Sequence, residues 1–277
     1  SFMSEPLRIL VTLDEHYLSK LNIMLLSLLD SSPGEAFEVY LMHASIPDEA
    51  LITTRRLLGE RGTLIPVPVR AEEFSDAPTS DRYPKEMYYR IFAAHYLPEQ
   101  LERVLYLDPD IIVNQSLREL YDMPMGDNFF AAATHIRSLL HRFNEVRLDM
   151  DEDSPYINSG VMLINLKALR AEQKVQEVYD YIESHKTKLF LPDQDIISGL
   201  YGSRILPLDP LRYNMTERLF VLYRQQNREL TVDYIRRHTA ILHFCGRNKP
   251  WNSVYFGRLN EFYDRAAEKY DAFLKTL

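Results

Sequence analysis

The sequence has little that would cross-link it and no stretch that would bind a polyanion. Cys245 is the only cysteine among 277 residues, so an intrachain disulfide is excluded and a reducing compartment is expected. The formal net charge is -8, and Lys and Arg are not clustered. Nucleic-acid-binding proteins need clustered cations to neutralise phosphates, so no nucleic-acid partner is expected. A phosphorylated small molecule stays compatible with this charge, provided that a metal ion or a few local cations neutralise it.

Long apolar runs and targeting signals are also missing. The most apolar stretch, residues 21–29, is too short to span a bilayer and contains Ser27. The N-terminus lacks the basic stretch and apolar run of a signal peptide. Residues 257–277 are typical of a helix with mixed charges rather than a basic membrane-surface anchor. We therefore expect a protein without a transmembrane segment, located in the cytoplasm.

The order of apolar segments predicts an α/β fold in a single domain, residues 1–277. Strands alternate with helices, which indicates βαβ units and a largely parallel sheet. Pro66 and Pro68 favour an edge position for the third strand. Strands are expected at residues 8–12, 37–43, 63–69, 103–107, 129–134, 156–166 and 240–244, and helices at 18–29, 47–58, 85–96, 167–185 and 257–277.

Two carboxylates follow the fourth expected strand, in Leu-Tyr-Leu-Asp108-Pro109-Asp110. Parallel sheets bind ligands at the carboxyl ends of their strands, so Asp108, and Asp14 after the first strand, lie where a ligand is expected. Paired carboxylates suit a hard divalent ion such as Mg²⁺ or Mn²⁺, which also takes phosphate oxygens. The alternative is a simple Asp-Pro-Asp turn.

A second polar segment, His243-Phe-Cys-Gly246-Arg-Asn-Lys249-Pro-Trp251, follows the last expected strand. An imidazole added to an oxygen-rich site favours Mn²⁺ over Mg²⁺. Gly246 allows close backbone approach to a ligand, and Lys249 supplies a point charge suited to a phosphate. The alternative is a buried histidine at a strand end before a loop.

Two further segments carry polar groups that could hold a small ligand. Asp193-Gln194-Asp195 opens a helix, where Asp193 could simply be the N-cap and an exposed Gln194 would need no explanation. Asn158-Ser-Gly precedes a buried strand, where it could grip a ligand or form an ordinary turn. Neither segment is informative alone.

Taken in order, six segments resemble glycosyltransferase family 8, which includes bacterial lipopolysaccharide galactosyl- and glucosyltransferases and the self-glucosylating glycogenins. They run from the first strand almost to the last helix. The segments are Ile-Leu-Val-Thr-Leu-Asp14-Glu-His-Tyr17, Tyr-Tyr-Arg90, Leu-Tyr-Leu-Asp108-Pro-Asp110, Ile-Asn158-Ser-Gly-Val-Met-Leu-Ile-Asn-Leu, Asp193-Gln194-Asp195 and His243-x-x-Gly246-x-x-Lys249-Pro-Trp251.

The resemblance implies a GT-A fold, which is a Rossmann-like mixed sheet flanked by helices, with residues 1–115 as the nucleotide-binding half and 116–277 as the donor and acceptor half. It implies transfer of glucose or galactose from a UDP-sugar to a saccharide or glycolipid acceptor, with retention of configuration. Mn²⁺, or Mg²⁺ in its place, would bridge the protein and the pyrophosphate. The implied metal ligands are Asp108, Asp110 and His243; the implied uridine-binding residues are Val11, Thr12, Asp14 and Tyr17; Gly246 and Lys249 would hold the diphosphate, and Arg90, Asn158, Asp193 and Gln194 the donor sugar.

Retention leaves two routes open. Asp193 is the candidate carboxylate for a double displacement, yet it could equally grip sugar hydroxyls. Gln194, expected near the anomeric carbon, is a poor nucleophile and favours attack on the face that the leaving group vacates. Two alternatives to this function are a nucleotide-sugar-binding protein without turnover and a self-glycosylating protein.

The chain departs from the galactosyltransferases of the family at one position. His135 stands where those enzymes have an aspartate toward the acceptor side, so a lactose-like acceptor is not assumed. Acceptor pockets come from variable loops, here expected at residues 71–85 and 212–228.

Overall fold

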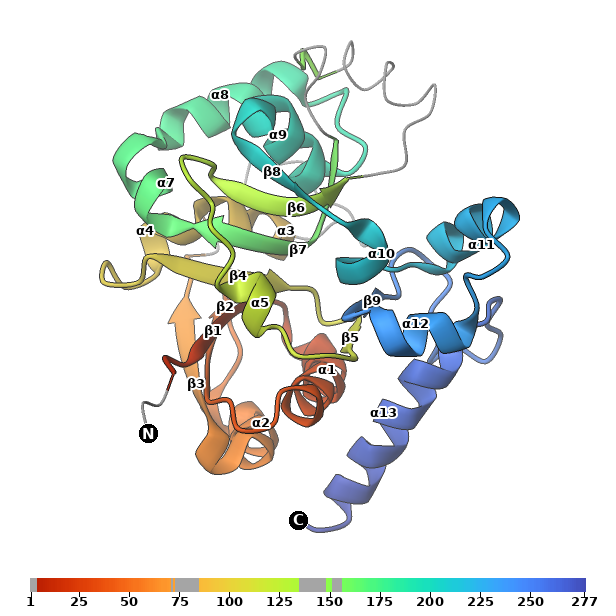
Figure 1. The fold of residues 1–277 in the computed structure, drawn as a ribbon. Coiled ribbons are helices and arrows are strands. Elements are labelled where there is room, and N and C mark those ends of the chain that lie inside the picture. Colours follow the sequence, from red (N-terminus) through yellow and green to blue (C-terminus); the bar gives the residue numbers. More distant parts are fainter. Residues whose placement is uncertain (1–3, 71, 73–84, 135–147, 151–155) are drawn as a thin grey trace.

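A seven-stranded mixed sheet forms the centre of the molecule (Figure 1). The computed structural model describes residues 4–70, 72, 85–134, 148–150 and 156–277. The strand order is β3-β2-β1-β4-β7-β6-β8. The strands are β1 Leu7–Thr12, β2 Phe37–His43, β3 Gly62–Pro68, β4 Arg103–Leu107, β6 Phe130–Thr134, β7 Ile157–Asn165 and β8 Ile205–Leu208.

The strand directions are mostly parallel, as predicted, with one strand reversed. Parallel pairs are β1 with β2 and β4, β2 with β3, and β6 with β8. Strand β7 runs antiparallel to both of its neighbours, β4 and β6. The proline-containing strand β3 lies at one edge, as Pro66 and Pro68 predicted.

The strands are buried on both faces, which explains their nearly continuous apolar sequences. Within β1, Ile9 and Val11 belong to one buried cluster, while Leu10 belongs to the cluster on the opposite face. This alternation follows from the two-residue period of a strand. Each face of the sheet therefore needs its own cover of helices.

Two groups of helices provide this cover (Figure 1). The first group lies on the side that holds Ile9, with α13 packed against α1, and it comprises α1 Leu18–Ser31, α2 Ile52–Leu58, α5 Arg118–Tyr121, α10 Pro210–Tyr213, α11 Glu217–Gln226, α12 Val232–His238 and α13 Asn260–Leu274. The second packs on the face that holds Leu10, and it comprises α3 Glu86–Tyr89, α4 Ala93–Tyr96, α7 Leu166–Glu172, α8 Val175–His185 and α9 Pro192–Tyr201. Short 3₁₀ turns occur at Glu15–Tyr17, Asp48–Leu51, Gly59–Arg61, Arg90–Phe92 and Gly202–Arg204.

A separate two-stranded ribbon connects the end of β4 to the C-terminal part of the chain. It consists of β5 (Ile111–Val113) and β9 (Ile241–His243), which run antiparallel. Ile111 lies opposite His243. Because Asp110 immediately precedes Ile111, this pairing brings two distant polar segments together. The sequence patterns did not predict β5 or this ribbon.

The long helix predicted at residues 167–185 is wrong, because the chain forms α7 and α8 with a break at Gln173 and Lys174. Both break residues have extended backbone, with ψ of 127° and 115°. The buried Gln173 amide donates to the Ile91 carbonyl at 3.0 Å and to the Tyr201 hydroxyl at 2.9 Å. These tertiary hydrogen bonds, which periodicity cannot reveal, favour the break. Likewise, the predicted helices at 47–58 and 85–96 consist of shorter helical pieces.

The described part of the chain contains no helix that is both long enough and apolar enough to cross a membrane.

Candidate active site

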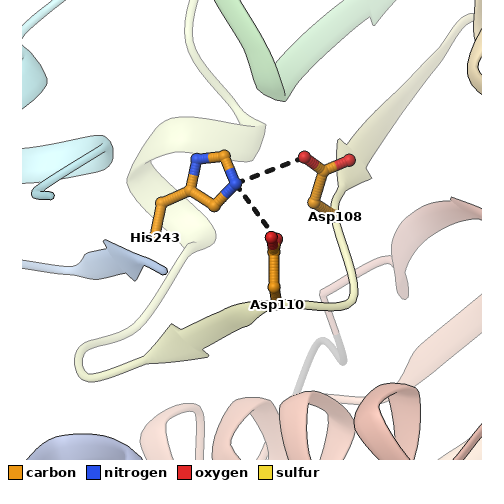
Figure 2. A group of neighbouring side chains, drawn as sticks. All are labelled: Asp108, Asp110 and His243. Atoms are coloured by element: carbon orange, nitrogen blue, oxygen red, sulfur yellow. Dashed lines mark ion pairs between the residues drawn. The ribbon is translucent and has the colours of Figure 1, made fainter. Parts of the chain in front are cut away.

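Three side chains of metal-ligand type converge where β4 ends (Figure 2). Asp108 and Asp110 lie on the bend between β4 and β5, and His243 is the last residue of β9. One ligand atom from each residue lies within 4.8 Å of the others. The imidazole Nε2 lies 3.0 Å from Asp110 Oδ1 and 3.3 Å from Asp108 Oδ2. The proposed metal ligands are thus neighbours in space.

The electrostatics of this cluster favour a cation between its members. His243 Nε2 and Asp110 Oδ1 are buried and lie 3.0 Å apart, but neither atom makes a hydrogen bond of good geometry with any described residue. Burial lowers the pKa of His243, but the nearby carboxylates, Asp110 first, outweigh burial and raise it well above its ordinary value. Two hard oxygen ligands and one imidazole suit a divalent ion such as Mn²⁺. The chemistry and the unpartnered atoms of the cluster therefore fit a divalent metal.

Gly160 has no side chain, and this makes room for the Asp108–Asp110–His243 cluster. It lies on β7, and its carbonyl accepts a hydrogen bond from the Asp108 backbone N–H at 2.9 Å. A Cβ at this position would lie 2.3 Å from His243 Cε1 and 2.8 Å from Asp108 Oδ2. Any side chain here would therefore displace two of the three ligand-type residues.

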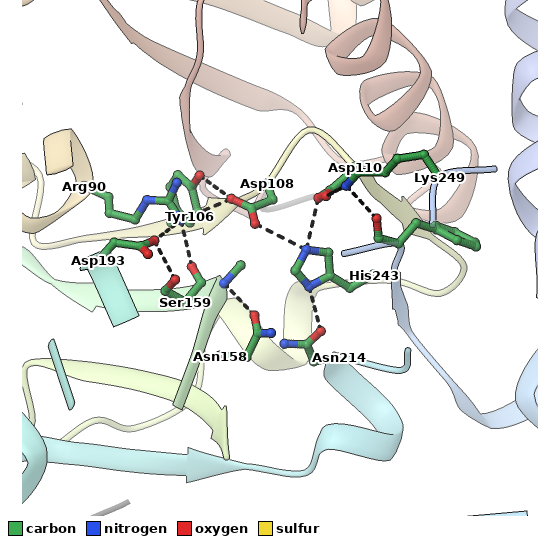
Figure 3. Close-up of polar contacts among 12 residues, drawn as sticks. Arg90, Tyr106, Asp108, Asp110, Asn158, Ser159, Asp193, Asn214, His243 and Lys249 are labelled. Carbon is green, nitrogen blue, oxygen red and sulfur yellow. Dashed lines mark hydrogen bonds and ion pairs between the residues drawn. The ribbon is translucent and has the colours of Figure 1, made fainter. Parts of the chain in front are cut away.

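Arg90 connects the cluster to a second acidic group on α9 (Figure 3). Its Nη1 lies 3.1 Å from Asp108 Oδ1 and 3.0 Å from Asp193 Oδ2. The guanidinium stacks over the Tyr106 ring at 4.0 Å, and the Tyr106 hydroxyl donates to Asp108. Burial alone would raise the pKa of Asp108, but Arg90 and His243 outweigh it and lower the pKa. A buried cation thus keeps Asp108 ionised.

Asp193 is a buried ion-pair partner rather than a helix cap. The N-cap of α9 is Leu191, and Asp193 is only 3% exposed. Its Oδ2 also accepts a 2.6 Å hydrogen bond from the Ser159 hydroxyl. Burial raises the pKa of Asp193, an effect that Arg90 opposes. The purely structural explanation of Asp193 as an N-cap is therefore wrong.

Gln194 is also buried, at 6% exposure, against the expectation of an exposed amide. Its Nε2 donates to the Tyr156 hydroxyl at 3.1 Å. That hydroxyl donates to Asp195 Oδ1 at 2.5 Å, while Asp195 Oδ2 accepts from the backbone N–H groups of Phe190 and Leu191. The start of α9 is thus held by a buried polar network beside the Asp193–Arg90 pair.

Lys249 lies on the other side of the metal-type cluster. Its Nζ contacts Asp110 Oδ2 at 2.6 Å and the Phe244 carbonyl at 2.8 Å. Coulombic attraction to His243 and then to Lys249 overcomes burial and lowers the pKa of Asp110. Gly246, three residues earlier, has a φ of 82°, a left-handed conformation that favours glycine. The loop after β9 therefore places a cation beside Asp110.

Comparison with known proteins identifies the family of this chain. Residues 8–254 match the model of the family described as glycosyl transferase family 8. The chain belongs to glycosyl transferase family 8. Similar proteins include a lipopolysaccharide 1,2-glucosyltransferase of Escherichia coli, 28% identical over 87% of this chain and 71% of that protein. General stress protein A of Bacillus subtilis (strain 168) is 27% identical over 90% of this chain and 88% of its own length.

Solved structures agree on the fold. The galactosyltransferase LgtC, in complex with donor and acceptor sugar analogs, superimposes with a TM-score of 0.82 at 24% identity, covering 95% of this chain and 96% of LgtC. The glycosyltransferase GlyE of Streptococcus pneumoniae TIGR4 gives a TM-score of 0.70 at 22% identity, over 99% of this chain and 63% of GlyE. The fold of this family 8 chain is therefore the GT-A fold that the resemblance implied.

The residues expected to bind uridine lie at the end of β1, next to β4. Val11 and Thr12 are buried on β1, and the register pairs Leu10 with Tyr106 on β4. Asp14 accepts a 2.9 Å hydrogen bond from the His16 N–H and caps the 3₁₀ turn that carries Tyr17. The Tyr17 ring is 41% exposed. This edge adjoins Asp108, and an exposed ring suits stacking on a base.

Other expectations have mixed outcomes. Asn158 lies within β7 rather than before it, and its Oδ1 accepts from the Gly160 N–H at 2.9 Å. His135 lies outside the described residues, as does most of the acceptor loop expected at 71–85. The loop expected at 212–228 contains helix α11.

The sequence reasoning missed several residues that build the site. Tyr106 and Gly160 lie inside quoted segments but were not singled out, although a glycine in a buried strand can signal close packing. Ser159 was given no role of its own within the Asn158-Ser-Gly segment, and Tyr156 was placed only at the start of an expected strand. Asn214 had no local signal, because its significance depends on a contact with His243, 29 positions away in the chain.

Proposed function

We propose that this family 8 glycosyltransferase moves glucose or galactose from a UDP-sugar to a saccharide acceptor, with Mn²⁺ and with retention of configuration. One observation carries the proposal: the Asp108–Asp110–His243 cluster is joined through Arg90 to Asp193 at the start of α9. A cluster suited to a metal ion and a polar group suited to a sugar therefore share one edge of the sheet, as transfer from a nucleotide sugar requires.

The donor would lie along this edge of the sheet. Val11, Thr12, Asp14 and Tyr17 at the end of β1 would hold the uridine, with the exposed Tyr17 ring stacked on the base. Lys249 and the Gly246 backbone would contact the diphosphate. Arg90, Asn158, Asp193 and Gln194 would surround the sugar. Residues 1–115 would thus supply the nucleotide-binding half.

Sugar transfer requires the site to stabilise negative charge on the departing diphosphate. When bound, Mn²⁺ would act as a Lewis acid toward the diphosphate oxygens. Lys249 would supply a second fixed positive charge near Asp110, and preorganised charge of this kind lowers the barrier without a dedicated general acid. Arg90 would keep Asp108 ionised, since its guanidinium lies 3.1 Å from that carboxylate.

Asp193 would hold the sugar rather than attack it. Its Oδ2 already accepts a 2.6 Å hydrogen bond from the Ser159 hydroxyl and lies 3.0 Å from Arg90 Nη1 in an ion pair. A carboxylate fixed in this way is suited to gripping a hydroxyl, which supports attack on the face that UDP vacates. We expect Asp193→Asn to weaken donor binding while retaining measurable transfer. Complete loss of turnover with unchanged donor affinity would instead favour a covalent intermediate on Asp193.

The relatives' names support a hexose donor and a saccharide acceptor. They include lipopolysaccharide glucosyl- and galactosyltransferases, which use related sugars. The first experiment therefore screens hexose donors without assuming an acceptor.

The test measures thermal stabilisation and UDP release with UDP-glucose, UDP-galactose and UDP-N-acetylglucosamine, each with Mn²⁺ and with EDTA. We expect one donor to raise the melting temperature and to release UDP slowly, only with Mn²⁺. Asp110→Asn should abolish both effects, because it removes one carboxylate charge from the cluster. Lys269→Met, which breaks an exposed ion pair with Asp30, is the matched charge-removal control.

The outcomes separate the alternatives. Stabilisation without UDP release from any donor, with or without added saccharides, would indicate a nucleotide-sugar-binding protein. Mass increases of the protein in hexose steps would indicate self-glycosylation. If no UDP-sugar shifts the melting temperature even with Mn²⁺, the proposed donor site is wrong and the family relationship describes only the fold.

A further inference from the structure

Asn214 is held against the far side of the His243 ring from the two carboxylates (Figure 3). It ends α10, and its backbone N–H donates to the Pro210 carbonyl at 2.9 Å. The next residue, Met215, exchanges backbone hydrogen bonds with β9: its N–H donates to Ile241 at 3.0 Å, and its carbonyl accepts from His243 at 2.8 Å. The Asn214 backbone is therefore fixed to the same strand that carries His243.

The side chain of Asn214 contacts the imidazole directly. Its Oδ1 lies 3.0 Å from His243 Nδ1. An amide oxygen can only accept a hydrogen bond, so this contact places a proton on Nδ1. The Nε2 atom, which faces Asp108 and Asp110, is then the atom available to a metal ion.

A second observation separates Asn214 from an ordinary core amide. The residue is 3% exposed, yet its Nδ2 is buried without a hydrogen-bond partner among the described residues. Leaving a buried amide donor unpaired costs about 1–3 kcal/mol. An apolar residue would avoid this cost, so stability alone does not explain an asparagine here. Its oxygen has a specific partner, whereas its nitrogen does not.

We propose that Asn214 is a positioning residue for the metal site: it fixes the tautomer and the ring orientation of His243, so that Nε2 faces the metal position. The inference rests on the proposed metal-dependent function and deepens it. Mutating a residue that hydrogen-bonds to a metal-ligating histidine typically weakens metal binding about 10- to 100-fold. Neither propensity nor spacing marks this residue in the sequence.

The test compares a substitution that keeps a hydrogen-bond acceptor with one that removes it. Asn214→Asp keeps an acceptor at the same place, whereas Asn214→Leu has a similar volume and no acceptor. Mn²⁺ binding is titrated on the full chain without any donor, by the electron paramagnetic resonance signal of free Mn²⁺. We expect the Leu variant to bind Mn²⁺ about 10- to 100-fold more weakly, and the Asp variant to bind it about as tightly as the unsubstituted protein.

A matched control tests whether a lost buried amide alone weakens metal binding. Asn22 is 4% exposed, and its amide bonds to Tyr270 and Thr54 in the helical layer that includes α1. Asn22→Leu should lower the melting temperature and leave the Mn²⁺ affinity unchanged. Unchanged affinity in Asn214→Leu, or equal weakening in Asn214→Asp, would overturn the proposal. If the Leu variant does not fold, Asn214→Ala, which also lacks an acceptor, takes its place: weaker Mn²⁺ binding in the Ala variant but not in the Asp variant supports the proposal, and equal binding in both overturns it.

A readout without metal separates this inference from the proposed function. In metal-free protein labelled with ¹⁵N-histidine, at a pH high enough to leave His243 neutral, Nδ1 should show the shift of a protonated nitrogen and Nε2 that of an unprotonated one, assigned by their loss in His243→Gln. An unprotonated Nδ1 would overturn the inference. If the unsubstituted protein takes up no Mn²⁺, the proposed metal dependence fails, and the nitrogen spectrum still decides the role of Asn214.

Discussion

Gly160→Ala adds a single methyl group to β7 at the point where the metal-type cluster packs. The new Cβ would lie 2.3 Å from His243 Cε1, and 2.8 Å from both His243 Nδ1 and Asp108 Oδ2. Real Cβ atoms do not approach other atoms so closely, so something must move. All three atoms belong to side chains of the cluster. The chain would therefore relieve the clash by displacing Asp108 and His243 while keeping its fold.

The expected magnitude has two parts. Overpacking in a well-packed region costs about 1–3 kcal/mol, and each kcal/mol lowers the melting temperature by roughly 2–4 °C in a chain of this size class. Gly160 does not have a positive φ, so alanine adds no backbone strain. The larger effect should be on metal binding, because a displacement of this size moves two of the three proposed ligands. We expect Mn²⁺ affinity to fall by at least the roughly 10- to 100-fold typical of lost outer-shell support.

The assay pairs Mn²⁺ titration with thermal unfolding in EDTA. Gly62→Ala is the control, because the three atoms nearest to the added Cβ all belong to the flexible Leu58 side chain, at 3.0 Å or more. That variant should leave Mn²⁺ affinity unchanged. A Gly160→Ala protein that binds Mn²⁺ as tightly as the unsubstituted protein would show that the cluster tolerates the methyl group. The reasoning from close packing would then be refuted.

Two further substitutions test the connections within the site. Arg90→Met removes the cation beside the buried Asp193 and the half-buried Asp108, and should cost about 3–5 kcal/mol in urea unfolding. Lys269→Met at an exposed pair should cost less than about 1 kcal/mol; equal losses would contradict the role of burial. Tyr156→Phe removes the hydroxyl that accepts from Gln194, and should slow UDP release by about tenfold, which is one hydrogen bond's worth of free energy. Mn²⁺ affinity should not change in Tyr156→Phe. The control Tyr40→Phe, away from the site, should leave the rate of UDP release unaltered. An unchanged rate of UDP release in Tyr156→Phe would show that Gln194 needs no hydrogen bond to Tyr156.

Local patterns predicted much of the fold. The alternation of short apolar strands with helices indicated a largely parallel sheet, and prolines placed β3 at the edge. These features depend on propensity and period, which act within a few residues. The predicted helix at 167–185 failed for the converse reason, because buried hydrogen bonds of Gln173 to distant residues favour the break.

The sequence also determined which residue types stand at the strand ends. Asp108 and Asp110 follow β4, His243 ends β9, and Asp193 opens α9, as their local sequences indicated. Each segment alone was compatible with a turn, a cap or a core histidine. Only their order along the chain pointed to one family and one site.

Only the tertiary structure decided how these residues act on one another. The β5–β9 ribbon brings His243 beside Asp110, and Arg90 joins Asp108 to Asp193. Gly160 and Asn214 matter because of atoms that lie opposite them in space. Such effects arise from burial and from contacts between residues far apart in the chain, so no local pattern records them. The sequence by itself therefore determined which groups are available, and folding determined their distances, their charges and their partners.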